Sequence, residues 1–134
     1  AADVLIWTFR NNIIVKRNPH MYGWVAVDED NNASKVSCKT PLSKNPVHDH
    51  AIVGTFYFRE ARYFIDGAKE MIKKDRRINN EFYVDEVINV LIEGGLRVKV
   101  FEVDKYICWG TPNDLRAYQY WERYFKKILG TNNG

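Results

Sequence analysis

The stretch that most limits how this chain can fold is residues 51–58, AIVGTFYF. None of its residues is charged, most are aromatic or β-branched, and Asp49 and Arg59 flank it. A run of this length and composition predicts a β-strand that is buried on both faces. Gly54 in its middle weakens the strand but leaves room for another backbone or a ligand, so it is a first candidate site residue.

The chain is long enough to bury one hydrophobic core. It has 134 residues, of which 46% are hydrophobic, and this length predicts a single globular unit. The net charge of +3 is small and the basic residues alternate with acidic ones, so no nucleic-acid partner is expected. No segment reaches transmembrane length, so no membrane partner is expected either. Two widely separated cysteines, Cys38 and Cys108, favour a reducing, cytoplasmic location.

The first half of the chain predicts further strands. Residues 3–9 form a second apolar run, and a buried strand so close to the first residue predicts that the natural chain extends upstream and that this is a fragment. Residues 22–27 and 33–39 flank an acidic, Asn-rich turn and predict a hairpin. Residues 40–50 carry two prolines and predict a long surface loop.

The second half predicts helices around one more strand. Apolar residues recur at helical spacing in 61–72 and 84–92, and Gly94-Gly95 marks the end of the second helix. Residues 96–106 predict a strand. Thr111 followed by Pro112 and Asp114 predicts the start of a last helix, whose aromatic stripe favours a core or subunit contact. Residues 130–134 predict a frayed tail.

Strands separated by helices of this length predict an α/β domain with a mixed, mostly parallel sheet and flanking helices. Ligands in such folds gather at the carboxyl ends of strands. The chemically able residues expected near strand ends and turns are Tyr22, Gly23, Lys39, Gly54, Glu81, Asp104 and the turn 108–111. No familiar nucleophile motif or phosphate loop is present.

Two of these residues indicate the kind of ligand. Lys39 supplies a point charge for a phosphate, and Glu81 can accept hydrogen bonds from sugar hydroxyls. From the residue types alone, Lys39 could equally well be an ordinary surface lysine and Glu81 an ordinary glutamate at a helix N-terminus. His48 and His50 lie two residues apart beside Asp49, but two loop ligands without a third fall short of a zinc site, so no metal-binding residue is assigned.

Five short motifs then occur in one order along the chain. They are Tyr22-Gly23, Lys39 with Pro41, VGTFYF at 53–58, NEFYVD at 80–85 and WGTP at 109–112. In this order they resemble the second half of a bacterial sugar-phosphate nucleotidyltransferase, a family that includes the glucose-1-phosphate thymidylyltransferases. The resemblance covers nearly the whole chain. It implies a Rossmann-like nucleotidyltransferase domain, of which residues 1–134 would be the sugar-phosphate-binding part.

The resemblance also implies roles for individual residues. Gly23, next to Tyr22, would offer its backbone to the sugar, and Gly54 would let the sugar lie against the strand. Lys39 would hold the phosphate of a sugar-1-phosphate, and Glu81 would bind sugar hydroxyls. The implied partners are a sugar-1-phosphate and a nucleoside triphosphate or nucleotide sugar, with a possible homo-oligomer.

The resemblance shows equally what this chain lacks. The family's Gly-rich nucleotide loop is absent, and the ligands of the expected Mg²⁺ would lie mostly outside this chain, so the catalytic residues stay unassigned. Cys108 stands where related enzymes carry a metal-binding Asp, and a thiol is a poor ligand for Mg²⁺. Cys38 stands where many members have a Glu before the lysine.

We therefore interpret the sequence as the sugar-phosphate-binding portion of an enzyme that makes a nucleotide sugar and pyrophosphate for cell-surface polysaccharide synthesis. The reaction is attack of a sugar-1-phosphate oxygen on the α-phosphorus of the triphosphate. Two alternatives remain open. One is a non-catalytic sugar-nucleotide sensor or regulatory subunit, and the other is an interaction module that uses the aromatic last helix.

Overall fold

The computed structural model describes residues 1–130 and divides the chain into two compact units, where length alone predicted one. The first unit, Ala1–Asp104, holds all the strands and two α-helices. The second begins at Lys105 and holds the last helix. Residues 131–134, most of the predicted tail, lie outside the described residues. Each unit is described separately.

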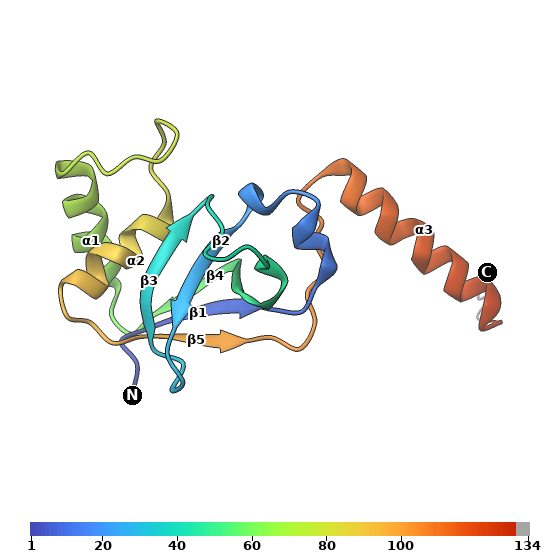
Figure 1. The fold of residues 1–134 in the computed structure, drawn as a ribbon, viewed down its shortest axis with the longest axis horizontal. Coiled ribbons are helices and arrows are strands. Elements are labelled where there is room, and N and C mark those ends of the chain that lie inside the picture. The colour runs from blue at the N-terminus through green and yellow to red at the C-terminus, as the bar shows by residue number, and fades with distance from the viewer. Residues whose placement is uncertain (131–134) are drawn as a thin grey trace. The chain divides into compact units, whose positions relative to one another are not determined.

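Five strands form one sheet in the first unit (Figure 1). They are β1 (Val4–Phe9), β2 (Gly23–Val27), β3 (Ala33–Cys38), β4 (His50–Phe58) and β5 (Val98–Glu102). Their order across the sheet is β3-β2-β4-β1-β5. The predicted hairpin is therefore confirmed, and β1 is an internal strand as its apolar run indicated. β5 is shorter than the predicted strand over 96–106.

The sheet is mixed, as predicted, but antiparallel pairs outnumber parallel ones, contrary to the expectation of a mostly parallel sheet. β1 and β5 run parallel, whereas the pairs β1–β4, β2–β3 and β2–β4 are antiparallel. Parallel neighbours need a long crossover, usually a helix. The connection from β2 to β3 is a short turn without an α-helix, which accounts for the antiparallel β2–β3 pair.

β4 was predicted to be buried on both faces, and this prediction is wrong for most of the strand. Residues 50–52 are buried, whereas Gly54, Thr55 and Tyr57 are exposed. β4 pairs with β1 from residue 51 to residue 58, but β2 pairs with β4 only at residues 50 and 51. Among residues 1–130 no further strand lies beside the rest of this edge. Beyond residue 52, Phe56 and Phe58 are partly buried against the core, while Thr55 and Tyr57 beside them are exposed.

Two helices cover one part of the sheet. They are α1 (Ala61–Lys73) and α2 (Val84–Glu93), which lie side by side in Figure 1. Gly67 of α1 permits their close approach, because a Cβ atom there would lie 2.8 Å from Cδ2 of Leu91 and 2.9 Å from Cγ1 of Val87. Both helices occur where the apolar spacing predicted them.

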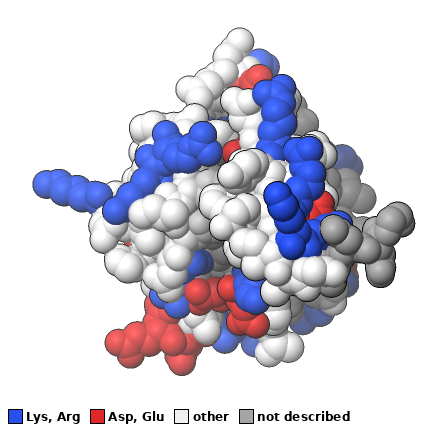
Figure 2. Space-filling model, turned by 90° about the vertical axis from the view of Figure 1, so that its right-hand side faces the viewer, with Lys and Arg blue, Asp and Glu red and all other residues white. Residues whose placement is uncertain are grey.

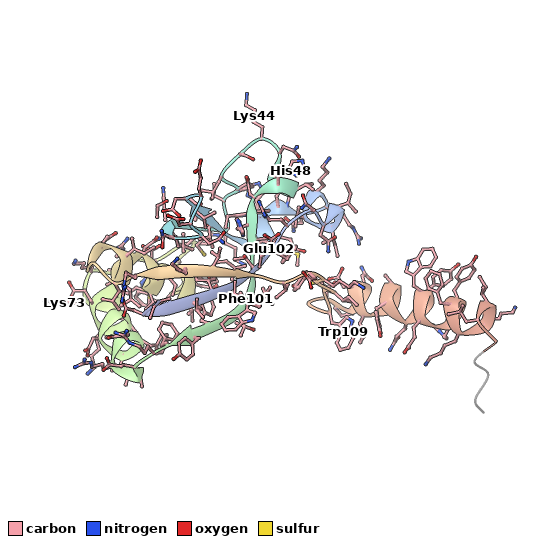
Figure 3. The ribbon with its side chains drawn as sticks, turned by 90° about the horizontal axis from the view of Figure 1, so that it is seen from below. Lys44, His48, Lys73, Phe101, Glu102 and Trp109 are labelled. Carbon is pink, nitrogen blue, oxygen red and sulfur yellow. The ribbon has the colours of Figure 1, made fainter. Side chains whose placement is uncertain are left out.

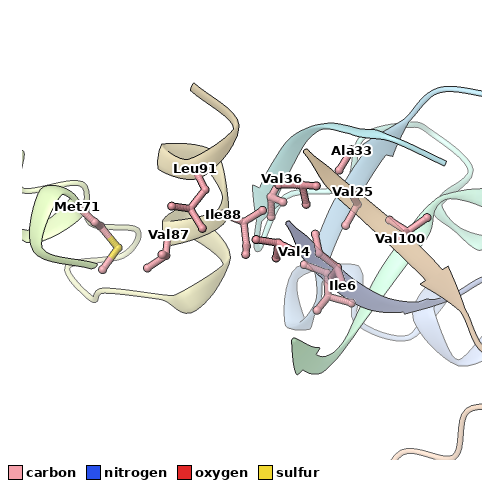
Figure 4. Close-up of a cluster of buried hydrophobic side chains, with 12 residues drawn as sticks. Val4, Ile6, Val25, Ala33, Val36, Met71, Val87, Ile88, Leu91 and Val100 are labelled. Atoms are coloured by element: carbon pink, nitrogen blue, oxygen red, sulfur yellow. The ribbon is translucent and has the colours of Figure 1, made fainter. Parts of the chain in front are cut away.

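The core joins these helices to the sheet through α2. In Figure 4, Ile88 points toward Val36 and Val4 of the strands, while Leu91 lies on the side nearer Met71 of α1. Ile88 and Val4 have no exposed surface. α2 therefore forms a layer between α1 and the sheet, and its burial contributes hydrophobic stabilisation on both sides. The buried core residues are Val4, Ile6, Val25, Ala33, Val36, Ile52, Met71, Val87, Ile88, Leu91, Val98 and Val100.

The second unit consists of a short extended segment and α3 (Pro112–Ile128). Thr111 and Asp114 form a capping box, in which the Thr111 hydroxyl accepts from the Asp114 backbone N–H and the Asp114 carboxylate accepts from the Thr111 backbone N–H. The predicted start of the helix is thus confirmed. Along α3 the Trp121 ring lies 5.7 Å from that of Tyr124 and 6.0 Å from that of Phe125, between centroids.

Surface charge is mixed. Figure 2 shows basic and acidic side chains on the same face, with uncharged atoms between them. Within the described part of the chain, no helix combines the length and the apolar composition that crossing a bilayer requires.

Candidate functional site

Three segments that are far apart in the sequence meet beside β3. They are the start of β2, the end of β3 and the residues that lead into α2. Gly23 pairs directly with Cys38 across the β2–β3 hairpin. Asp85, in the first turn of α2, lies against Gly23 and hydrogen-bonds the Cys38 thiol. This meeting point contains the predicted residues Gly23 and Lys39, and we call the group Gly23, Cys38, Lys39, Glu81, Tyr83 and Asp85 the Lys39 cluster.

A side-chain clamp fixes α2 at this edge of the sheet. The Asn89 amide accepts a hydrogen bond from the Val36 backbone N–H and donates one to the Val36 carbonyl, both at 2.8 Å. Asp85 and Asn89 are four residues apart and share one face of the helix, while residues 36 and 38 share one face of the strand. Asp85 lies one helical turn before Asn89, so the Asn89 clamp also holds Asp85 in contact with Cys38.

Lys39 is held in an unusual backbone conformation. Its φ is +61°, in the left-handed region that L-residues other than Gly, Asn and Asp rarely adopt. Its backbone N–H donates to the Tyr22 carbonyl at 3.1 Å, and its carbonyl accepts from Nδ1 of His20 at 3.0 Å. Nζ donates to the Met21 carbonyl at 2.9 Å. Strain of this kind at a non-glycine residue persists where surrounding contacts hold it, and it concentrates at functional sites.

Two polar side chains of the α2 lead-in segment face this lysine. Lys39 Nζ lies 5.3 Å from the centroid of the Tyr83 ring, within the range of a cation–π contact. The Tyr83 hydroxyl donates to the Glu81 carboxylate, and this hydrogen bond raises the pKa of Tyr83. Asn79 and Asn80 both have positive φ in the tight turn that precedes Glu81, a conformation that Asn tolerates better than most residues. Tyr83 thus contacts both the Lys39 ammonium and the carboxylate of the predicted residue Glu81.

Cys38 and Asp85 occupy the buried side of the cluster. Burial, together with the nearby Asp85 carboxylate, raises the pKa of the Cys38 thiol to about 11, so the thiol stays protonated and can donate to Asp85. Burial raises the pKa of Asp85, and the positive charge of Lys39 opposes that rise. A protonated thiol of this kind is a weak nucleophile, because the thiolate is the reactive form.

Gly23 is required here for space. A Cβ atom on Gly23 would lie 2.1 Å from Oδ2 of Asp85 and 2.9 Å from Cδ1 of Ile52, well inside contact distance. Its φ is not in the left-handed region, so the requirement is steric. The backbone of β2 and the carboxylate of Asp85 are therefore in direct contact.

We expect Gly23→Ala to displace the Asp85 carboxylate and to lower the free energy of unfolding by about 1–3 kcal/mol, the usual cost of overpacking. Urea unfolding of Gly23→Ala, Asp85→Ala and the double variant measures this. Because Asp85→Ala removes the atoms that clash, the double variant should lose less stability than the sum of the single variants. Strict additivity would show that Gly23 and Asp85 do not contact each other.

Two predicted site residues, Tyr22 and Gly54, do not belong to the Lys39 cluster. The Tyr22 ring is buried between Phe9 and Trp24, with centroids 5.8 and 6.0 Å away, so only its backbone carbonyl faces Lys39. Gly54 has a φ of +110° at a register shift between β1 and β4, and no atom lies within 4 Å of where its Cβ would be. Its freedom of backbone conformation explains Gly54 at this position.

The histidines and the second cysteine serve other contacts. His50 is buried and its Nδ1 lies 2.9 Å from the Thr8 hydroxyl, whereas His48 lies 3.0 Å from the Asn11 side chain on the exposed loop labelled in Figure 3. Cys108 accepts from the Gly110 backbone N–H and lies 3.7 Å from Asp114 of the capping box. Within residues 1–130 no three His, Cys, Asp or Glu side chains lie close enough together to hold a metal ion.

Sequence reasoning missed Asp85, Tyr83 and His20. Asp85 was read within the motif at 80–85, but an acid in the first turn of a helix is ordinarily explained by the helix dipole. His20 lies in a Pro-containing turn whose relation to Lys39 depends on the positive φ of that residue. The sequence signal that could have found Asp85 is its four-residue spacing from Asn89, a second polar residue on the inner face of an amphipathic helix.

Comparisons with known proteins agree with the fold. No protein-family model matches the chain, and no curated protein matches its sequence. The nucleoside-diphosphate-sugar pyrophosphorylase from Vibrio cholerae RC9 is structurally similar, with a TM-score of 0.71 and 16% identity over 87% of this chain and 46% of that chain. A CMP:2-keto-3-deoxy-manno-octonic acid synthetase solved with CTP has a TM-score of 0.55 and 16% identity, over 92% of this chain and 50% of that one.

At 16% identity these similarities show the fold. The chain spans about half the length of both structures. This chain, with its five-stranded mixed sheet, has the α/β fold of these two proteins over about half of their length.

Proposed function

We propose that this chain is the sugar-phosphate-binding portion of a nucleotidyltransferase that makes a nucleotide sugar and pyrophosphate. The observation that carries the proposal is the Lys39 cluster, in which three distant segments of the chain hold one strained lysine beside hydroxyl-binding groups. The similarity of the fold to a nucleoside-diphosphate-sugar pyrophosphorylase supports the same reading.

The chemistry of the cluster suits a sugar that carries a phosphate. Lys39 supplies the positively charged ammonium group of the cluster. A charge-assisted hydrogen bond to a phosphate oxygen is the strongest contact available to that group. Glu81 and Tyr83 are already hydrogen-bonded to each other and can exchange that bond for sugar hydroxyls.

The complete reaction needs more than the described residues supply. A nucleoside triphosphate and Mg²⁺ would be bound mostly by residues outside this chain, as the resemblance to the family implies. We place the protein among the thymidylyltransferase-like enzymes of bacterial cell-surface polysaccharide synthesis, acting in the cytoplasm. Cys38 and Cys108 are both free thiols, as a reducing compartment allows.

A thermal-shift titration against a panel of hexose-1-phosphates, with and without Mg²⁺, tests the proposal. A ligand that binds only the folded state raises the melting temperature as it saturates the site. At least one hexose-1-phosphate should raise the melting temperature of the wild-type chain and of Lys44→Ala, but not of Glu81→Ala. Lys44 is the matched control, because it projects from the tip of the exposed loop between β3 and β4 (Figure 3).

The outcomes separate the candidate functions. A hexose-1-phosphate that shifts Glu81→Ala as strongly as the wild type would contradict the assigned site. Binding by wild type, with no pyrophosphate released when triphosphate and Mg²⁺ are added to the natural full-length protein, would favour a sensor over an enzyme. No shift with any member of the panel would contradict sugar-phosphate binding by this chain.

A further inference from the structure

The positive charge of Lys39 and the negative charge of Asp85 both contact the short backbone segment 21–23. Lys39 Nζ donates to the carbonyl of Met21, and Oδ2 of Asp85 lies against the Cα of Gly23, where a Cβ atom would be only 2.1 Å away. Two residues of extended chain span at most about 7 Å. The ammonium of Lys39 and the carboxylate of Asp85 therefore both lie along the start of β2, where the charge of Lys39 acts on Asp85 through space.

The other groups around Asp85 do not compensate its charge. From β3 it meets Cys38, whose thiol stays protonated, and from its own helix it meets Glu86, another acid. Glu86 is itself paired with Arg76 at 2.5 Å and accepts from Asn89, so Arg76 is engaged there.

Tyr83, bonded to Glu81, faces Asp85 from the lead-in segment, and Ile52 of β4 brings no charge. The positive charge that acts on Asp85 comes from Lys39.

We propose that Asp85 is the counter-ion of Lys39 in this cluster. When Lys39 binds a phosphate group, the phosphate replaces Asp85 as the counter-ion and Asp85 takes up a proton. The inference rests on the proposed function, because it specifies how the same site accepts a phosphate. It makes Asp85 a positioning residue that sets the charge of the site, and it predicts that binding is linked to pH.

The sign of the linkage follows from the surroundings of Asp85. Burial raises the pKa of Asp85, whereas the Lys39 charge and hydrogen bonds from the Cys38 thiol and the Asp85 backbone oppose that rise. A bound phosphate neutralises that charge and adds negative charge, which raises the pKa of Asp85 further. Protonation and phosphate binding therefore favour each other, and Asp85 weakens phosphate binding only while it is ionised.

The first measurement needs no ligand. The side-chain carboxyl carbon of Asp85 is followed by ¹³C NMR through a pH titration in the wild-type chain, in Lys39→Met and in the control Lys44→Met. Loss of the counter-ion should raise the pKa of Asp85 in Lys39→Met and leave it unchanged in Lys44→Met. An unchanged pKa in Lys39→Met would overturn the pairing.

The second measurement uses α-D-glucose 1-phosphate and inorganic phosphate as probes, titrated calorimetrically between pH 4.5 and 8. Asp85→Asn should bind about tenfold more tightly than wild type at pH 7.5, since one neighbouring charge shifts such equilibria by about one pKa unit or more. The advantage should vanish as the pH falls through the pKa of Asp85, because the wild-type carboxyl is then also neutral. Titration of the phosphate itself cancels in this ratio, and Asp66→Asn on exposed α1 is the control.

The two measurements have distinct failures. Weaker binding by Asp85→Asn at every pH would show that Asp85 binds the ligand directly, and would overturn the proposal. A ratio independent of pH would overturn the coupling. If neither probe binds, the proposed function and the coupling both fail, while the NMR titration still decides whether Lys39 and Asp85 are paired.

Discussion

Lys39→Ala is expected to weaken binding of the hexose-1-phosphate by about 1.5–3 kcal/mol, which is the range for hydrogen bonds to charged groups. This corresponds to roughly a 10- to 150-fold rise in Kd. The lysine is the cation of the cluster, and its Nζ is already held at 2.9 Å from the Met21 carbonyl, so little conformational freedom is lost when a phosphate binds. Isothermal titration calorimetry of Lys39→Ala beside Lys44→Ala measures the effect.

The backbone of Lys39 supplies an internal control for this prediction. At φ +61° an alanine is strained whereas a glycine is not, and the difference is about 1 kcal/mol. Lys39→Gly should therefore be more stable than Lys39→Ala by about that amount in urea unfolding, and both variants should bind the ligand similarly weakly. Equal affinity of Lys39→Ala and wild type would make this residue an ordinary surface lysine, whatever its backbone conformation.

Ile88→Ala is expected to lower the free energy of unfolding by about 2–5 kcal/mol, the range observed when a large aliphatic side chain is removed from a core. Ile88 is fully buried between α2 and the sheet and points toward Val36 (Figure 4). The cavity would open beside the clamp that positions Asp85, because Asn89 follows directly in the helix. Urea unfolding monitored by circular dichroism measures the loss.

The control for Ile88→Ala is the same change at Ile72, on the outer face of α1. The Ile72 side chain is 56% exposed, so Ile72→Ala should change the free energy of unfolding by no more than about 0.5 kcal/mol. Similar losses in both variants would mean that α2 is not the layer between α1 and the sheet.

Local patterns predicted the helices and the hairpin correctly. Thr111, Pro112 and Asp114 predict a helix start by their local capping preferences, and the structure forms the capping box that they indicated. The helix over 84–93 needed only its spacing of apolar residues and the two glycines after it. Signals of this kind depend on neighbours within one or two turns, so they can be read without the tertiary structure.

The errors concern features that depend on distant segments. The strand at 50–58 has the composition of a buried strand, but its burial depends on whether another strand lies beside it, and among the described residues β2 reaches only its first two positions. In the same way, Phe64 and Ile65 follow the apolar spacing of α1 and yet remain exposed, because α2 covers only the side that holds Gly67 and Met71.

The candidate site was predicted in part for the same reason. Gly23 and Lys39 lie at one end of the β2–β3 hairpin, and Glu81 is connected to Lys39 only through Tyr83. The Tyr22 ring joins the aromatic core, and Gly54 provides a backbone conformation that β4 needs at its register shift. The sequence analysis did not place Asp85 in the site, because its position there depends on the hydrogen bonds between Asn89 and Val36, two residues 53 positions apart. Contacts between distant segments are set by packing and leave little trace in local composition.

The most direct test of the account is a ¹H–¹⁵N NMR titration of the chain with α-D-glucose 1-phosphate and the other hexose-1-phosphates of the panel. The account predicts that saturable shift changes concentrate at the backbone amides of Gly23, Lys39, Glu81 and Tyr83, and that Lys39→Ala abolishes them. Saturable changes confined to another surface, such as the acidic turn between β2 and β3, or no saturable change with any sugar phosphate, would contradict the claim that the Lys39 cluster is a sugar-phosphate site.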